Sequence, residues 1–270
     1  MRLLFLGDIL GRAGRDAVIA ELPGLKRDLA VDFTVVNAEN AAGGFGVTEK
    51  ICQSLYEVGV DAITTGNHVW DQRELIGTID GDARLLRPAN YPTGTPGKGA
   101  RVFALADGRR VLVINVMCRL FMDALDDPFA CLEREFSSRS LGGSVQAALV
   151  DVHGEATSEK MAIGHFLDGR ASLVVGTHSH IPTADAQILP KGTAYQTDAG
   201  MCGDYDSVIG MQKAPAIARF VRKMPGERLT PAEGEATVCG VFVETDDATG
   251  LARHVAPLRV GGRLSRAWPV

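Results

Sequence analysis

Short apolar runs alternate with longer amphipathic segments along most of this chain, and this alternation is what most constrains its fold. Strands buried on both faces are apolar throughout, whereas the helices that cover them need only one apolar stripe. The runs interpreted as strands are residues 2–6, 33–37, 61–65, 147–152 and 171–175. The segments interpreted as helices are residues 14–30, 47–58, 71–79 and 157–167, with a break or kink expected at Pro23. The pattern predicts an α/β protein.

The middle and the end of the chain depart from this rhythm. Residues 101–106 and 110–116 are expected to form a hairpin across an Asp-Gly turn. Residues 117–138 mix aromatic and charged side chains, and they are interpreted either as a cover over one end of the sheet or as an ordinary packed excursion. Residues 238–243 and 254–260 predict an antiparallel pair that closes the sheet or forms a second sheet beside it.

Composition narrows the class of protein. A chain of 270 residues with 46% apolar content can bury one large core, so residues 1–270 are expected to form a single domain. The net charge of −5, from 28 basic and 33 acidic residues, supplies no basic stripe, and a long nucleic acid is not the expected partner. No apolar run approaches the roughly 18 residues of a membrane span. The sequence leaves open whether the chain forms a homo-oligomer.

The cysteines and the N-terminus indicate the cellular compartment in which the chain is expected to function. The five cysteines are Cys52, Cys118, Cys131, Cys202 and Cys239. Their odd number and wide spacing predict neither a disulfide framework nor a zinc knuckle, and they fit a reducing cytoplasm. The apolar start of the chain is interrupted by Gly7-Asp8 too early for a signal peptide, so it is interpreted as a buried strand.

Side chains that can bind metals follow the carboxyl ends of the five predicted strands. They are Asp8, Glu39 with Asn40, Asn67 with His68, His153, and His178 with His180. Taken singly, each could be an ordinary turn or cap residue. Ligands of open α/β sheets, however, bind in the crevice beyond the carboxyl ends of the strands, so all five groups are expected to face one basin.

The number of donors favours two metal ions. Apart from His68, the set offers two carboxylates, two amides and three imidazoles, which is too many for one tetrahedral site with an open position. Glu39 is expected to bridge the two ions, and imidazole-rich ligation favours Fe, Mn, Zn or Co over Mg or Ca. His68 is left over, and it is interpreted as the acid that protonates the leaving group or as an orienting residue.

Three of these segments resemble the spaced motifs of the calcineurin-like metallophosphoesterases, in their usual order. They are Gly7-Asp8, Gly66-Asn67-His68 and Gly176-Thr177-His178-Ser179-His180. The usual Asp-x-His start is Asp8-Ile9-Leu10 here, and Asn37-Ala38-Glu39-Asn40 replaces the usual Gly-Asp-x-x-Asp block. With these departures the chain resembles the YmdB-type branch, almost from end to end.

The resemblance implies a fold, a metal centre and an activity. The implied fold is a four-layer αββα sandwich of two mixed sheets flanked by helices. The implied centre is dinuclear, with iron as the first expectation. One metal is assigned Asp8, Glu39, Asn40 and His180; the other is assigned Glu39, Asn67, His153 and His178; and His68 is the acid. Asn40 could instead hold substrate or the bridging water.

The implied activity is hydrolysis of a small-molecule phosphodiester, of the 2′,3′-cyclic nucleotide type. In the expected mechanism, a hydroxide that bridges the metals attacks phosphorus, and His68 protonates the departing ribose oxygen. The alternatives are a phosphomonoesterase or nucleotidase, and a dinuclear hydrolase of another ester or amide. A further alternative is a regulatory module that uses the metal site to bind a nucleotide or an RNA end.

Overall fold

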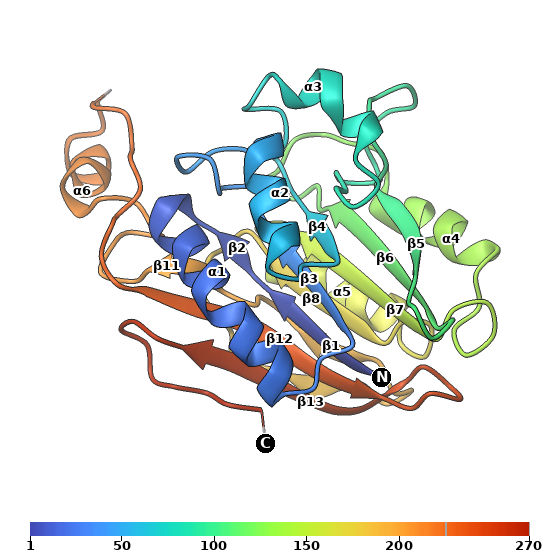
Figure 1. The fold of residues 1–270 in the computed structure, drawn as a ribbon. Coiled ribbons are helices and arrows are strands. Elements are labelled where there is room, and N and C mark those ends of the chain that lie inside the picture. The colour runs from blue at the N-terminus through green and yellow to red at the C-terminus, as the bar shows by residue number, and fades with distance from the viewer. Residues whose placement is uncertain (225, 270) are drawn as a thin grey trace.

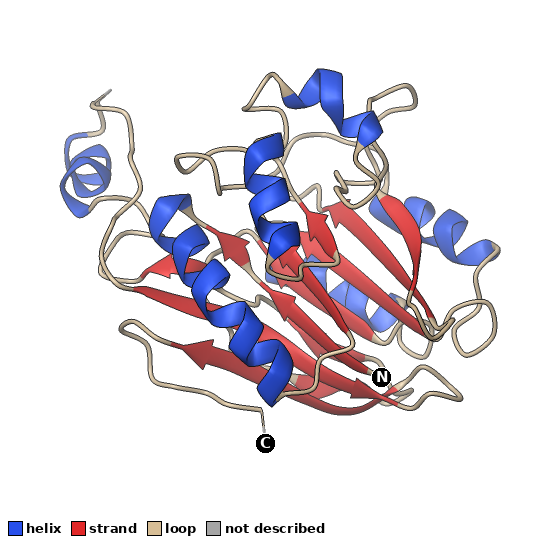
Figure 2. Ribbon diagram, viewed as in Figure 1, coloured by secondary structure: helices blue, strands red, loops and turns tan. Residues whose placement is uncertain are grey.

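Two mixed sheets lie face to face between layers of helices in the computed structural model, which describes residues 1–224 and 226–269 (Figures 1 and 2). The first sheet comprises β1 (Arg2–Leu6), β2 (Asp8–Ile9), β3 (Phe33–Asn37), β4 (Ala62–Thr64), β11 (Met201–Asp204), β12 (Ala236–Thr245) and β13 (Ala252–Val260). The second comprises β5 (Ala100–Ala104), β6 (Arg110–Met117), β7 (Ala147–His153), β8 (Leu173–Thr177), β9 (Gln187–Ile188) and β10 (Ala194–Gln196). Residues 225 and 270 of the predicted domain lie outside the described residues.

The alternation of side chains along each strand builds the layers. Leu3 and Phe5 of β1 belong to a buried cluster shared with the second sheet, whereas Leu4 packs with the helices on the opposite face. In β6, Val113 joins the shared cluster and Ile114 packs toward the outer helices. Because successive side chains of a strand point to opposite faces, each sheet is apolar on both sides. The predicted four-layer α/β sandwich is confirmed.

The helices are α1 (Gly11–Asp28), α2 (Glu49–Glu57), α3 (Leu75–Thr78), α4 (Pro128–Ser137), α5 (Thr157–Phe166) and α6 (Lys213–Arg222), with a 3₁₀ turn, η1 (Ile79–Gly81). The break expected at Pro23 is wrong, because α1 runs through it without interruption. Pro23 is exposed, while Leu22 and Leu25 on the other side of the helix are buried against the first sheet. That packing outweighs the loss of one backbone hydrogen bond on the solvent side.

The other secondary-structure predictions are confirmed only in part. The hairpin is confirmed as β5 and β6, and the last antiparallel pair, β12 and β13, joins the first sheet through β1. The helix predicted over residues 71–79 is much shorter, since residues 71–74 form bends and turns, and the Gln72 amide there donates to the Phe45 carbonyl (2.8 Å). Within 117–138, α4 packs on a face of the second sheet rather than over its end. The short strands β2, β9, β10 and β11, and helix α6, were not predicted.

In the part of the chain that the structure describes, no helix is both long enough and apolar enough to cross a membrane. All five cysteines lie in that part, and all are buried with free thiols.

Candidate metal centre

The predicted ligands meet at the joint carboxyl edge of the two sheets. β1, β3 and β4 run parallel in the first sheet, and β7 and β8 run parallel in the second, so each set of carboxyl ends lies on one edge. The backbone N–H of His178 donates to Asp8 Oδ2 (3.2 Å), and His153 Nε2 lies 3.2 Å from Glu39 Oε1. The basin predicted from one row of strand ends is therefore assembled from two sheets.

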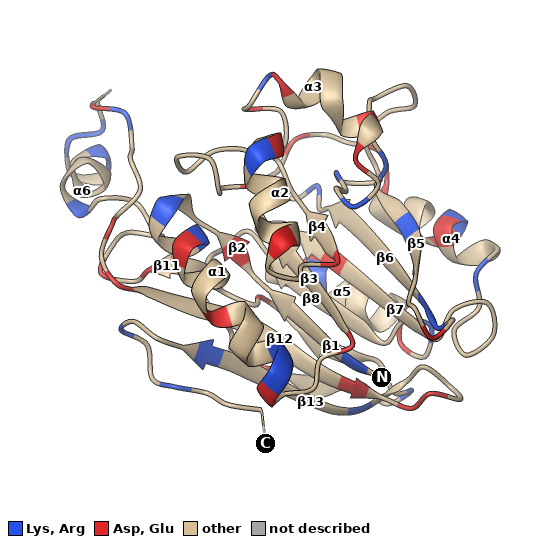
Figure 3. Ribbon diagram, viewed as in Figure 1, with Lys and Arg blue, Asp and Glu red and all other residues tan. Residues whose placement is uncertain are grey.

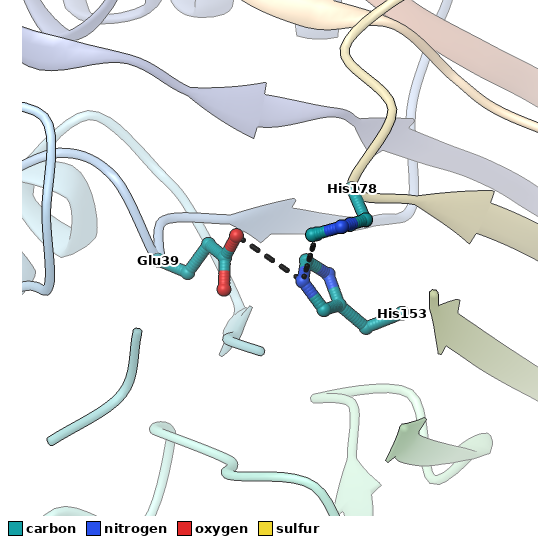
Figure 4. A group of neighbouring side chains, drawn as sticks. All are labelled: Glu39, His153 and His178. Atoms are coloured by element: carbon teal, nitrogen blue, oxygen red, sulfur yellow. Dashed lines mark hydrogen bonds and ion pairs between the residues drawn. The ribbon is translucent and has the colours of Figure 1, made fainter. Parts of the chain in front are cut away.

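One group of donors converges on the Nε2 atom of His153 (Figure 4). That nitrogen lies 2.9 Å from Asn67 Oδ1, 3.1 Å from His178 Nδ1 and 3.2 Å from Glu39 Oε1. Glu39, His153 and His178 each offer a ligand atom, and the three atoms lie within 4.8 Å of one another. These four residues are the set predicted for one of the two metals.

A second group contains Asp8, Glu39 and His180, whose ligand atoms also lie within 4.8 Å of one another. Glu39 belongs to both groups, as a bridging carboxylate must. Asn40 adjoins this second group through its amide nitrogen, which lies 3.1 Å from Glu39 Oε1 and 3.2 Å from His180 Nε2. For Asn40 to bind a metal, its amide has to turn so that the oxygen faces the cluster.

The charges of this cluster fit bound cations. Asp8 and Glu39 are almost fully buried, and Asp8 Oδ1 has no hydrogen-bond partner among the described residues. Burial raises the pKa of Asp8 to about 7, against the attraction of His180 and His153. Burial alone would lower the pKa of His153, but the charges of Glu39 and Asp8 raise it to about 9. A proton on His153 thus supplies the positive charge that the two buried carboxylates require. Cations would supply that charge instead.

The imidazole of His178 is in the form that binds metals. Burial and the neighbouring His153 lower the pKa of His178 to about 3, which keeps its ring neutral at physiological pH. The residues present therefore fit a pair of metal ions in charge, donor type and burial.

Gly66 keeps the space between the ligand atoms open. A Cβ atom at this position would lie 2.3 Å from both Glu39 Oε2 and His153 Nε2. We expect Gly66→Ala to displace these ligands and to weaken metal binding by at least about tenfold, measured as metal content after dialysis. The control is Gly77→Ala, since a Cβ atom there meets nothing within 4 Å. Equal metal content in the two variants would contradict this role for Gly66.

A buried network behind the ligands orients His153. Its Nδ1 lies 2.9 Å from Thr177 Oγ1, and the Thr177 hydroxyl donates to Asp151 Oδ1 (2.7 Å). Asn37 of the first sheet donates to the other oxygen of Asp151 (3.0 Å). With Nδ1 engaged, His153 presents Nε2 to the cluster. Asp151 and Thr177 were not predicted from the sequence, although the polar pair Asp151 and His153, two apart in an apolar strand, was a usable signal.

His68 lies beside the cluster and does not belong to either donor group. Its backbone N–H donates to Glu39 Oε2 (3.3 Å), and its ring Nδ1 lies 2.8 Å from Asp71 Oδ2. The ring is about one-third exposed, with Phe45 packed edge-on against it at 5.1 Å between centroids. Asp71 therefore fixes the ring and leaves Nε2 for a ligand. Asp71 was also missed, and its signal was the three-residue spacing from His68.

Two mixed sheets inside flanking helices, with metal-type ligands at their joint carboxyl edge, define a metallophosphoesterase-type fold. A sequence model of the YmdB-like proteins matches residues 4–258. The chain belongs to this family, as its motifs predicted.

Individual relatives cover nearly the whole chain. The 2′,3′-cyclic-nucleotide 2′-phosphodiesterase of Bacillus subtilis (strain 168) is 49% identical over 252 residues, which are 93% of this chain and 94% of that protein. The crystal structure of a hypothetical protein from Thermus thermophilus has a TM-score of 0.90 at 42% identity and covers 97% of this chain and 100% of its own. The crystal structure of a novel phosphatase from Mycoplasma pneumoniae has a TM-score of 0.88 at 34% identity, and the match covers 97% of this chain and 93% of the phosphatase.

Proposed function

We propose that this chain is a metal-dependent phosphodiesterase that hydrolyses small 2′,3′-cyclic nucleotides. The observation that carries the proposal is the pair of largely buried donor groups that share Glu39 at the joint edge of the sheets. The activity named for the Bacillus subtilis relative, at 49% identity, supports the substrate class.

The residues that would hold the two metals form two sets. One set is Asp8, Glu39, Asn40 and His180, and the other is Glu39, Asn67, His153 and His178. Iron is the first candidate, with Mn, Zn and Co as alternatives, because three imidazoles and two carboxylates suit these ions. When bound, such ions neutralise phosphate charge and lower the pKa of a coordinated water.

The chain's own residues supply the proton and the alignment. His68 would hold a proton at Nε2 and give it to the departing ribose oxygen, while Asp71 keeps the ring in place through Nδ1. The bond from the His68 backbone to Glu39 Oε2 ties the position of this acid to that of the shared carboxylate. Asp151 and Thr177 fix the direction of His153.

Attraction for the anionic substrate would come from the centre itself. Acidic and basic residues are interspersed over most of the ribbon (Figure 3), in keeping with a net charge of −5. We also propose that residues 1–270 act as a single domain, because one buried cluster is shared by both sheets. Five free thiols suit a reducing compartment, and on this basis we propose that the chain acts in the cytoplasm.

Initial rates on four substrates test the proposal. With added Mn²⁺ or Fe²⁺, we expect 2′,3′-cAMP and bis-p-nitrophenyl phosphate to be hydrolysed, and 3′,5′-cAMP and p-nitrophenyl phosphate to react far more slowly. Preference for p-nitrophenyl phosphate would instead indicate a phosphomonoesterase. Nucleotide binding without turnover by the metal-loaded protein would indicate a regulatory module.

A further inference from the structure

The turn that carries two candidate ligands has an unfavourable backbone. His178 has φ of 97° and His180 has φ of 66°, and both values lie in the left-handed region that favours glycine. Two such residues on either side of Ser179 persist only where the surrounding structure fixes them. The contacts of Ser179, which lies between them, fix this turn.

A single buried carboxylate holds the middle of this turn. Asp198 Oδ2 accepts hydrogen bonds from the backbone N–H (3.1 Å) and the hydroxyl (2.7 Å) of Ser179. Its other oxygen accepts from the backbone N–H of Gly200 (2.9 Å), and the next residue, Met201, donates to the carbonyl of His180 (3.1 Å). Asp198 thus joins the ligand turn to the chain that enters β11.

Lys160 of α5 balances the charge of Asp198. Its Nζ lies 2.9 Å from Asp198 Oδ2, and the two side chains are 1% and 0% exposed. The aliphatic part of Lys160 reaches this position across Gly176, where a Cβ atom would lie 2.8 Å from the lysine Cδ. A buried carboxylate without such a partner would be strongly unfavourable.

We propose that Asp198, with its charge balanced by Lys160, is a positioning residue that holds the His178–His180 turn in its metal-binding conformation. The proposal rests on the proposed function only in taking these histidines as ligands. Among the described residues, Asp198 makes no hydrogen bond to either histidine ring, and it acts through Ser179 and through the backbone N–H of Gly200.

The first test compares Asp198→Asn with a matched variant, Asp168→Asn. Asp168 is also buried and also accepts backbone hydrogen bonds, from Lys191 (3.0 Å) and Thr193 (3.3 Å), but among the described residues it makes no hydrogen bond to a candidate ligand. We expect Asp198→Asn to weaken Mn²⁺ binding, measured by calorimetry, by about 10- to 100-fold. Asp168→Asn should lower Tm and leave Mn²⁺ affinity unchanged. Equal Mn²⁺ affinity in both variants would overturn the proposal.

The second test uses Ser179→Ala, which removes one hydrogen bond and keeps Asp198 paired with Lys160. We expect a smaller loss of Mn²⁺ affinity and, in metal-free protein, faster hydrogen exchange at the backbone amides of 178–180. Unchanged exchange in both Ser179→Ala and Asp198→Asn would refute the positioning role. Hydrogen exchange needs neither metal nor substrate. If the wild-type protein bound no Mn²⁺, the proposed function would be contradicted, but the exchange rates of the two variants would still test the positioning role of Asp198.

Discussion

Replacing Glu39 by Gln is expected to abolish hydrolysis and, at the same time, to weaken metal retention. Glu39 is the one residue that belongs to both donor groups, and each of its oxygens has a separate partner, His153 Nε2 at Oε1 and the backbone N–H of His68 at Oε2. Glutamine removes the charge and turns one acceptor into a donor. The loss of several kcal/mol of stabilisation corresponds to about a thousandfold or more in kcat/KM.

Metal content and activity, measured together, show whether Glu39 acts as a shared metal ligand or contacts the substrate. Elemental analysis should find clearly less metal in Glu39→Gln than in wild type, while Glu57→Gln, an exposed change at the end of α2, should retain both metal and activity. Full activity in Glu39→Gln would eliminate the shared-ligand scheme. Loss of activity with full metal content would instead place Glu39 in contact with substrate.

The positions of the ligands could be predicted because buried strands have a local signature. Residues 2–6, 33–37 and 171–175 are mostly apolar, so Asp8, Glu39 and His178, two or three positions after these runs, mark the edge of a sheet. What periodicity could not supply was the assignment of strands to sheets. β1 and β8 look alike in sequence, yet they lie in different layers, and the sandwich of two sheets was predicted from the resemblance to a known family.

Residues that act through tertiary contacts were not predictable in the same way. Asp198 follows the short strand β10 and has no local pattern that separates it from a turn residue. Its role depends on Lys160, 38 positions earlier in the chain, and on Ser179. Asp151 likewise bonds to Asn37 across the interface between the sheets, over a separation of 114 residues. Such contacts exist only once the sheets have packed.

His68→Gln is expected to slow one substrate far more than another. Hydrolysis of 2′,3′-cAMP expels a poorly stabilised ribose alkoxide, so loss of the proton donor should lower kcat by about 10²- to 10⁴-fold. Bis-p-nitrophenyl phosphate expels p-nitrophenolate, which needs little protonation, and its kcat should change by less than about tenfold. Asp71→Asn should follow the same selective pattern with a smaller loss, because it only loosens the hold on His68 Nδ1.

The metal content of His68→Gln shows whether the selective loss of activity comes from the missing proton donor. The contact of His68 with Glu39 is made by the backbone N–H, which glutamine keeps, so His68→Gln should bind as much metal as wild type. Equal losses on the two substrates with normal metal content would show that His68 binds the phosphate that both share. Equal losses with reduced metal content would make it a support of the Glu39 carboxylate. Only a loss that is much larger on 2′,3′-cAMP, at full metal content, would show that the His68 ring, held by Asp71, donates the proton.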